Sequence, residues 1–162
     1  MNDAPRPARP SVEIFSVLIR WSLGALFIYT GMEKALDPVA FLKMVRAYEV
    51  VQNHFLLNAI GALLPWFEVF CGLLLLLGVA VRGTALVLTV LLIAFTVQVF
   101  ERALAVQSLQ HIAFCAVKFD CGCGTGEVLI CRKLAENVLL ILLAAWLLAG
   151  RARRACLRHQ LW

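Results

Sequence analysis

The sequence has few charged residues for its length. Of 162 residues, 15% are charged and 62% are hydrophobic, and the mean hydropathy is +0.88. A soluble domain usually contains about 25% charged and about 45–50% apolar residues. Because so few polar side chains cannot cover the core of a soluble protein, the composition predicts a membrane protein with one domain.

Several functional motifs are also missing. The chain contains no nucleotide-binding loop, no hydrolase triad and no haem-attachment motif. Its three histidines, His54, His111 and His159, lie outside the predicted spans, which argues against haem held by a histidine pair inside a bundle. No nucleic-acid recognition motif accompanies the basic C-terminal tail, so we expect no nucleic-acid partner.

Long apolar segments are present instead. A helix needs about 20 mostly apolar residues to cross a bilayer, and its backbone must satisfy its own hydrogen bonds there. We therefore expect an all-α fold, a bundle of four transmembrane helices in a single domain over residues 12–150. The four spans are expected at about 14–32, 55–81, 84–104 and 134–149. Pro65 should kink the second, and "VRG" at 81–83 should form the turn to the third.

The distribution of arginine and lysine indicates the orientation. The C-terminal segment 151–162 carries four arginines, and positive residues favour the cytoplasmic side. The N-terminal segment 1–11 and this basic tail are therefore expected in the cytoplasm. Two loops, about 33–54 and 105–133, are then expected outside.

The first outer loop contains an amphipathic stretch. Phe41, Met44, Val45, Tyr48 and Val51 recur at helical spacing and share one face. Asp37 as N-cap and Pro38 at the first helical position mark the start of this short helix. We expect the helix to lie along the outer membrane surface.

Six cysteines are present, and four of them belong to the second outer loop. Cys71 falls inside the second span, where a cysteine usually acts as a small hydrophobic residue, and Cys156 lies in the cytoplasmic tail. The other four are Cys115, Cys121, Cys123 and Cys131. In an oxidising compartment such neighbours tend to form disulfides, and four cysteines allow three complete pairings.

Three chemistries are consistent with these four thiols. A Cys121–Cys123 couple would close a small ring that is easily reduced, with Cys131 as resolving thiol. Four thiolates, from Cys115, Cys121, Cys123 and Cys131, would instead bind zinc, or a subset would bind copper(I). The third alternative is one or two structural disulfides, for which Cys115 and Cys131 are the candidates.

Four motifs point to a family. They are "GMEKALDP", "LPWFEVFCGLLLLLG", "DCGCG" and "RKLAENVLLILLAAWLL". In order and spacing, the stretch from about Arg20 to Leu148 resembles the DoxX/MauE superfamily, and most closely its MauE branch, named for methylamine utilisation. The chain departs from the branch at Gly124-Thr125, which follows the second cysteine, and in having the additional Cys131.

The resemblance implies a fold, a location and a set of residues. It implies a four-helix bundle in the bacterial inner membrane, with the cysteine loop in the periplasm and a link to thiol–disulfide chemistry or quinone-coupled oxidation. The family's lysine and Asp-Pro at the outer end of the first span correspond to Lys34, Asp37 and Pro38. Its glutamate in the second span corresponds to Glu68, and its cysteine pair to Cys121 and Cys123.

Glu68 requires an explanation of its own, because an ionised carboxylate at the centre of a bilayer costs roughly 2.5 kcal/mol or more. Arg20, in the first span, is the expected partner, and a neutral Glu68 is the alternative. In a functional role Glu68 would accept a proton near a quinone or a transported species, and in a purely structural role it would bond to a neighbouring helix. Lys34, with Asp37 in the same polar rim, is expected to raise the thiolate fraction of the loop cysteines.

Two main functions follow. In the first, the chain is a component of a thiol–disulfide oxidoreductase system. Cys121 and Cys123 would take electrons from a periplasmic thioredoxin-like protein, and a quinone or a second membrane protein would receive them. In the second, it is a non-catalytic subunit that assembles or stabilises a larger respiratory or dehydrogenase complex. A thiolate metal protein is a further alternative.

Overall fold

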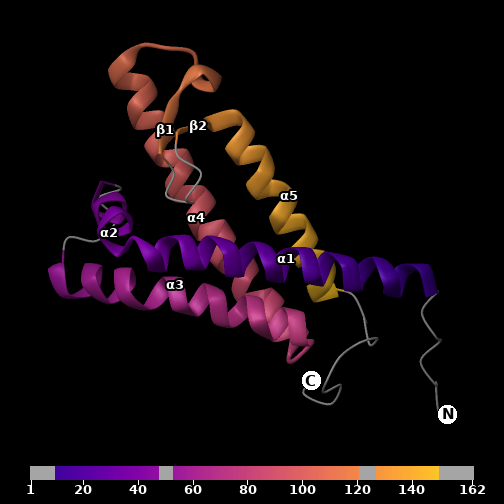
Figure 1. Cartoon of the computed structure of the whole chain (residues 1–162). Coiled ribbons are helices and arrows are strands. Elements are labelled where there is room, and N and C mark those ends of the chain that lie inside the picture. Colours follow the sequence, from indigo (N-terminus) through magenta and orange to yellow (C-terminus); the bar gives the residue numbers. More distant parts are fainter. Residues whose placement is uncertain (1–9, 48–52, 121–126, 150–162) are drawn as a thin grey trace.

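A computed structural model of the chain describes residues 10–47, 53–120 and 127–149, and these residues are mainly helical (Figure 1). In chain order, the elements are α1 (Pro10–Leu36), α2 (Pro38–Ala47), α3 (His54–Leu77), α4 (Val81–Gln110), the short 3₁₀ helix η1 (Phe114–Ala116), β1 (Lys118–Asp120), β2 (Glu127–Leu129) and α5 (Ile130–Ala149).

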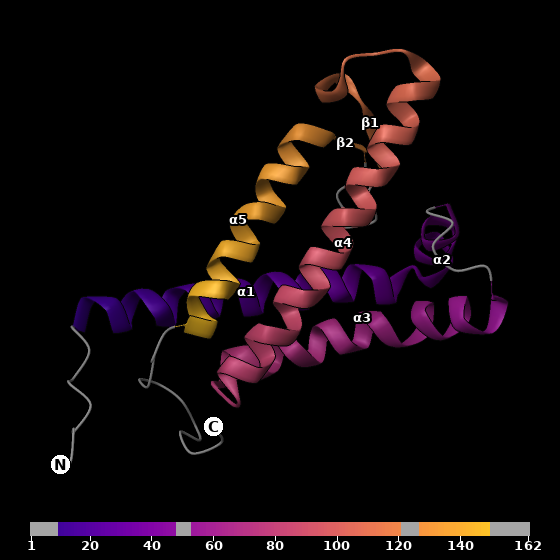
Figure 2. The ribbon, with the colours of Figure 1, turned by 180° about the vertical axis from the view of Figure 1, so that it is seen from behind.

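The long helices are arranged as two pairs. α1 packs along α3, and α4 packs along α5. The second pair crosses the first obliquely, as the two opposite views show (Figures 1 and 2). Smaller contacts join α1 to α5 and α3 to α4. At the α1–α5 contact, the indole Nε1 of Trp146 donates to Ser16 Oγ at 3.4 Å, and the ring of Trp146 meets that of Phe15 edge-on.

Glycines allow α1 and α3 to approach closely. A Cβ at Gly72 would lie 2.7 Å from the carbonyl oxygen of Gly24, and a Cβ at Gly24 would lie 2.9 Å from the carbonyl oxygen of Gly72. The two backbones are therefore in direct contact at this crossing. Small residues serve this purpose in membrane helices, where packing replaces the hydrophobic driving force.

The turn between α3 and α4 lies earlier than the sequence predicted. α3 ends at a left-handed Gly78 (φ 71°). The amides of Gly78 and Val79 donate to the carbonyls of Leu75 and Leu74 at 3.2 and 3.0 Å, the bonds of a Schellman motif. Val81–Gly83, predicted to be the turn, is the first turn of α4. Gly78 ends the helix because a glycine adopts the left-handed conformation without steric cost.

Apolar side chains form two buried clusters. The larger contains residues of all four long helices: Ile19, Leu23, Phe27, Cys71, Leu75, Ala85, Leu88, Leu92, Ala144 and Leu147. The smaller joins α4 to the segment before α5 and to the first residue of α5: Val99, Ala103, Val117 and Ile130. The first cluster holds the two helix pairs together, and the second supports the cysteine loop.

Three helices, α1, α3 and α4, are long and apolar enough to cross a membrane. Each corresponds to a predicted span, although α1 and α4 are longer than predicted. The loop after α4, which is predicted to lie outside, therefore begins at His111 and not at about residue 105. α5 is a helix where the fourth span is expected, but its first two turns carry Arg132, Lys133 and Glu136. The crossing of α5 stays a prediction, as does the orientation of the chain.

α2 begins where the sequence indicates. The Asp37 carboxylate Oδ1 accepts a hydrogen bond from the amide of Ala40 at 2.9 Å, the capping bond expected of an N-cap aspartate. Phe41 is buried, and Leu42 lies against Gly61 of α3. Of the predicted apolar face, Tyr48 and Val51 lie outside the described residues. Whether α2 lies on the membrane surface stays a prediction.

Candidate functional site

The cysteine loop is built on a short β-ribbon that the sequence analysis missed. β1 and β2 pair antiparallel, with Lys118 opposite Leu129, Phe119 opposite Val128 and Asp120 opposite Glu127. A weak signal was present in the sequence, since Val117, Lys118 and Phe119 alternate between apolar and polar residues. Strands of three residues are too short for such alternation to be distinguished from chance.

The ribbon is anchored at its base to the helices. Val117 and Ile130 are fully buried against Val99 and Ala103 of α4. The amide of Ile130 donates to the carbonyl of Val117 at 3.1 Å, which extends the pairing of the strands down to the start of α5. The base of the ribbon is therefore part of the protein core.

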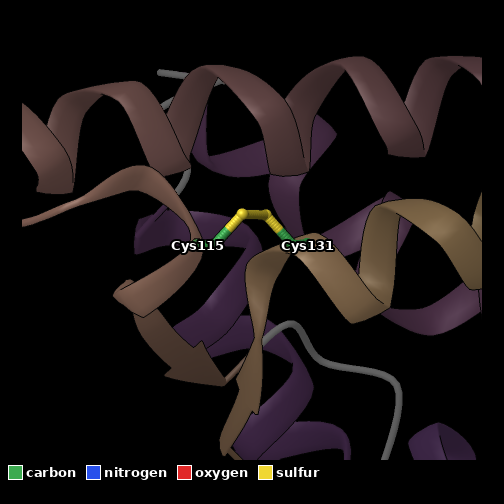
Figure 3. Close-up of a disulfide and its surroundings, with 2 residues drawn as sticks. All are labelled: Cys115 and Cys131. Atoms are coloured by element: carbon green, nitrogen blue, oxygen red, sulfur yellow. A yellow bond between two sulfur atoms is a disulfide. The ribbon is translucent and has the colours of Figure 1, made fainter.

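A disulfide closes the same base. Cys115 of η1 and Cys131 of α5 are bonded, with their Cα atoms 5.1 Å apart (Figure 3). From the sequence, both are candidates for a structural disulfide, and Cys131 is also a candidate resolving thiol. In the structure Cys131 has Cys115 as its partner, so it is not available as a resolving thiol in this state.

The pairing also bears on the metal alternative. A disulfide sulfur is not a thiolate, so Cys115 and Cys131 have no thiolate to offer zinc or copper while they are bonded. Within residues 10–47, 53–120 and 127–149, no group of three or more His, Cys, Asp or Glu side chains is placed to hold a metal ion. The described part of the loop therefore does not support a four-thiolate site.

Cys121 and Cys123 lie outside the described residues, and their chemistry stays a prediction. The structure describes the two ends of the segment that contains them. Asp120, immediately before Cys121, pairs with Glu127. Asp120 and Glu127 thus lie at the end of the β-ribbon that is away from the disulfide.

An ion pair joins α1 and α3. The ammonium Nζ of Lys34 lies 2.6 Å from both Oε1 and Oε2 of Glu68, and the two side chains are only 9% and 11% exposed. The ring of Phe41 covers the ammonium from α2, with its centroid 5.6 Å from Nζ. Three elements therefore meet at this pair.

The partner of Glu68 differs from the prediction. Arg20 is the partner expected from the sequence, but the Glu68 carboxylate is bound by Lys34. Arg20 and Lys34 are fourteen residues apart in one helix, which places their Cα atoms about 21 Å apart along the axis. Because α3 runs antiparallel to α1, only the C-terminal part of α1 reaches Glu68. Arg20 is buried nearer the opposite end of α1.

The chain matches a known protein family. Residues 12–150 match the family described as "Methylamine utilisation protein MauE". The chain belongs to the MauE family. With three helices able to cross a membrane, it is a multi-pass membrane protein of that family. No curated protein and no solved structure matches this MauE-family chain, and the wider DoxX relationship stays a prediction.

Two further polar residues of this MauE-family chain were missed. Lys133 and Asn137 are buried on α5, 9% and 2% exposed. Their four-residue spacing, continued by Ala144 and Leu147, places them on the face of α5 that packs against α4. This periodicity was a signal in the sequence, but charged neighbours in the first turns of α5 obscured it.

Proposed function

We propose that this MauE-family protein passes electrons from a periplasmic dithiol to a membrane quinone through the Cys121–Cys123 couple. The partner's two thiols become a disulfide, and the Cys121–Cys123 disulfide becomes two thiols. The quinone then accepts two electrons and two protons, becoming a hydroquinone, and the Cys121–Cys123 disulfide forms again.

The observation that supports this proposal is the bond between Cys115 and Cys131. Of the four cysteines in the outer loop, two are thereby assigned to a structural bond. Cys121 and Cys123 remain as a pair, separated by Gly122 alone. A disulfide across one residue closes a small ring and is easily reduced, so the couple suits electron transfer better than mechanical support.

The ribbon gives the couple a suitable position. Its base is fixed by Val117, Ile130 and the Cys115–Cys131 bond, and Cys121 follows directly at the end of β1. A ribbon with a fixed base suits a couple that has to react with a partner protein.

The Lys34–Glu68 pair receives a structural role in this proposal. Both oxygens of the carboxylate are bound by one ammonium at 2.6 Å, which leaves little capacity for a substrate. Glu68 is therefore assigned to joining α1 and α3, not to proton acceptance. The role of Lys34 in activating the loop thiols is likewise set aside.

The test uses the full chain in lipid nanodiscs. The protein is reduced with dithiothreitol under conditions that leave Cys115–Cys131 intact, then mixed anaerobically with decylubiquinone. We expect Cys121 and Cys123 to become inaccessible to N-ethylmaleimide, with one hydroquinone formed for each couple oxidised. Cys71→Ser is the control, because its buried thiol lies outside the couple and the variant should react normally.

If the two thiols remain alkylatable after quinone addition, the relay is excluded. The non-catalytic alternative predicts two other results. In that case a Cys121→Ser/Cys123→Ser variant would lose its association with the host's dehydrogenase complex, while the wild-type couple would show no quinone-dependent oxidation.

A further inference from the structure

Lys133 and Asn137 form an unusual pair of buried donors. Both lie on the α4-facing side of α5, one turn apart. An ammonium and an amide Nδ2 can only donate hydrogen bonds. The helix that they face, α4, is one of the three that are apolar enough to cross a membrane.

Asn137 has an unfilled donor. Its Nδ2 is buried and has no hydrogen-bond partner among the described residues, although the residue is only 2% exposed. A buried donor without a partner costs about 1–3 kcal/mol, and most buried polar side-chain atoms in proteins are bonded. The amide therefore points to an acceptor that is supplied from outside the described chain.

Lys133 is only weakly compensated. Its Nζ lies 3.9 Å from Oε2 of Glu136, which is too long for a hydrogen bond. The same carboxylate accepts from Arg132 Nε at 2.9 Å, and its side chain is 46% exposed. The Lys133 side chain is 11% exposed, and its ammonium, with a distant and shared counter-ion, has donors to spare.

The buried Lys34–Glu68 ion pair differs from Lys133 and Asn137 in how its polar groups are satisfied. Lys34 and Glu68 satisfy each other's hydrogen-bonding groups at 2.6 Å. Lys133 has only a distant counter-ion, and Asn137 Nδ2 has no hydrogen-bond partner among the described residues. The pair also lies close to the cysteine loop, because Cys131 precedes Lys133 by two residues. Ile130, at the base of the ribbon, starts the same helix.

From this geometry we infer that Lys133 and Asn137 bind the carbonyl oxygens of a quinone headgroup between α4 and α5. Two donors without an acceptor match a ligand that only accepts hydrogen bonds. The apolar character of α4 favours a lipid-soluble ligand over a hydrated anion. The Lys133 charge would also stabilise the negative charge that develops on a quinone oxygen during reduction. The inference rests on the proposed function, for which it supplies the acceptor site.

The test measures binding and not turnover, so that its failure can be distinguished from failure of the relay. Decylubiquinone is titrated into the oxidised full-length protein in nanodiscs. We expect Lys133→Met and Asn137→Leu each to weaken binding at least tenfold, and Lys133→Arg to keep most of the affinity. The matched controls are Lys43→Met and Asn58→Leu, two exposed positions where binding should not change.

Each of the other possible results either supports or overturns the quinone site. If Asn137→Leu raises the melting temperature and leaves quinone affinity unchanged, the amide holds only a buried water and the inference is wrong. Wild-type protein that binds no quinone also overturns it. Binding that is lost in both variants, in a protein whose Cys121–Cys123 couple is never oxidised, supports the site and removes the relay instead.

Discussion

Lys34 Nζ lies 2.6 Å from both carboxylate oxygens of Glu68 and is covered by the ring of Phe41. The pair joins the last turns of α1 to the middle of α3, and α2 closes over it. A long helical side chain points back toward the N-terminus of its own helix, which allows Lys34 to reach a glutamate that lies opposite an earlier turn of α1. One ion pair thus joins two membrane helices, with a side chain of a third helix packed over it.

Removing either partner alone should destabilise the protein strongly. Glu68→Gln leaves a buried ammonium without a counter-ion, and Lys34→Met leaves a buried carboxylate. Breaking a buried pair in this way costs about 3–5 kcal/mol. The free energy of unfolding, measured by denaturant titration in detergent micelles, should fall by that amount in each variant.

The double variant Lys34→Met/Glu68→Leu is the informative comparison. Because it removes both charges, it should recover most of the lost free energy of unfolding. Lys43→Met, at an exposed lysine of α2, serves as the control and should unfold like the wild type. If the double variant were as unstable as the two single variants added together, the two side chains would not act as a pair.

This pair also illustrates how far the sequence could lead. A carboxylate at Glu68 demanded a partner, and that much followed from the energetics of the membrane. Choosing between Arg20 and Lys34 required the register of α1 on α3, which depends on the contact between Gly24 and Gly72. Such a contact joins residues far apart in the sequence, and no local pattern reveals it.

The other elements also divide into those that the local sequence predicts and those that depend on long-range contacts. The start of α2 was predicted because Asp37 and Pro38 act locally, through one cap and one fixed backbone angle. The β-ribbon was missed because its strands are held by Val117 and Ile130 packing on α4, a long-range contact. The Cys115–Cys131 bond could be offered only as one of several alternatives, since spacing does not choose among pairings.

A methyl group at the α1–α3 crossing should separate the two helices. In Gly72→Ala the new Cβ would lie 2.7 Å from the backbone oxygen of Gly24, and backbone cannot move aside as a side chain can. Overpacking of this kind costs about 1–3 kcal/mol. The loss should appear as a lower free energy of unfolding and a lower melting temperature.

Gly83→Ala should change the free energy of unfolding in the opposite direction. A Cβ at Gly83 would meet no described atom within 4 Å, and the position lies in the first turn of α4. Alanine there should stabilise the helix by up to about 0.5–1 kcal/mol. Equal destabilisation by both substitutions would show that the Gly24–Gly72 contact is not what makes Gly72 sensitive.

Loss of the Cys115–Cys131 bond should weaken the ribbon base. The cysteines are 16 residues apart, and closing a loop of about 15 residues stabilises a protein by about 3 kcal/mol in the chain-entropy account. The variant Cys115→Ser/Cys131→Ser should lose that much free energy of unfolding. Hydrogen exchange should rise at the Ile130 amide, which bonds to Val117.

The double variant is preferred to either single one because a single substitution leaves a thiol that can attack Cys121 or Cys123. Treating wild-type protein with a reductant strong enough to open Cys115–Cys131 should reproduce the double variant's stability. If the reduced wild-type protein and the double variant were both as stable as the oxidised protein, the bond would not support the ribbon.

The Asp37 cap allows the most local test. The carboxylate accepts from the amide of Ala40 at 2.9 Å, whereas the amide of Phe41 bonds to the backbone carbonyl of Asp37 at 3.1 Å. Asp37→Ala removes only the first bond, at a cost of about 1 kcal/mol. Exchange of the Ala40 amide should therefore accelerate about fivefold, with a smaller change at Phe41. Asp37→Asn retains an acceptor oxygen and should restore protection at Ala40, so equal exchange in the alanine and asparagine variants would show that the side chain does not cap α2.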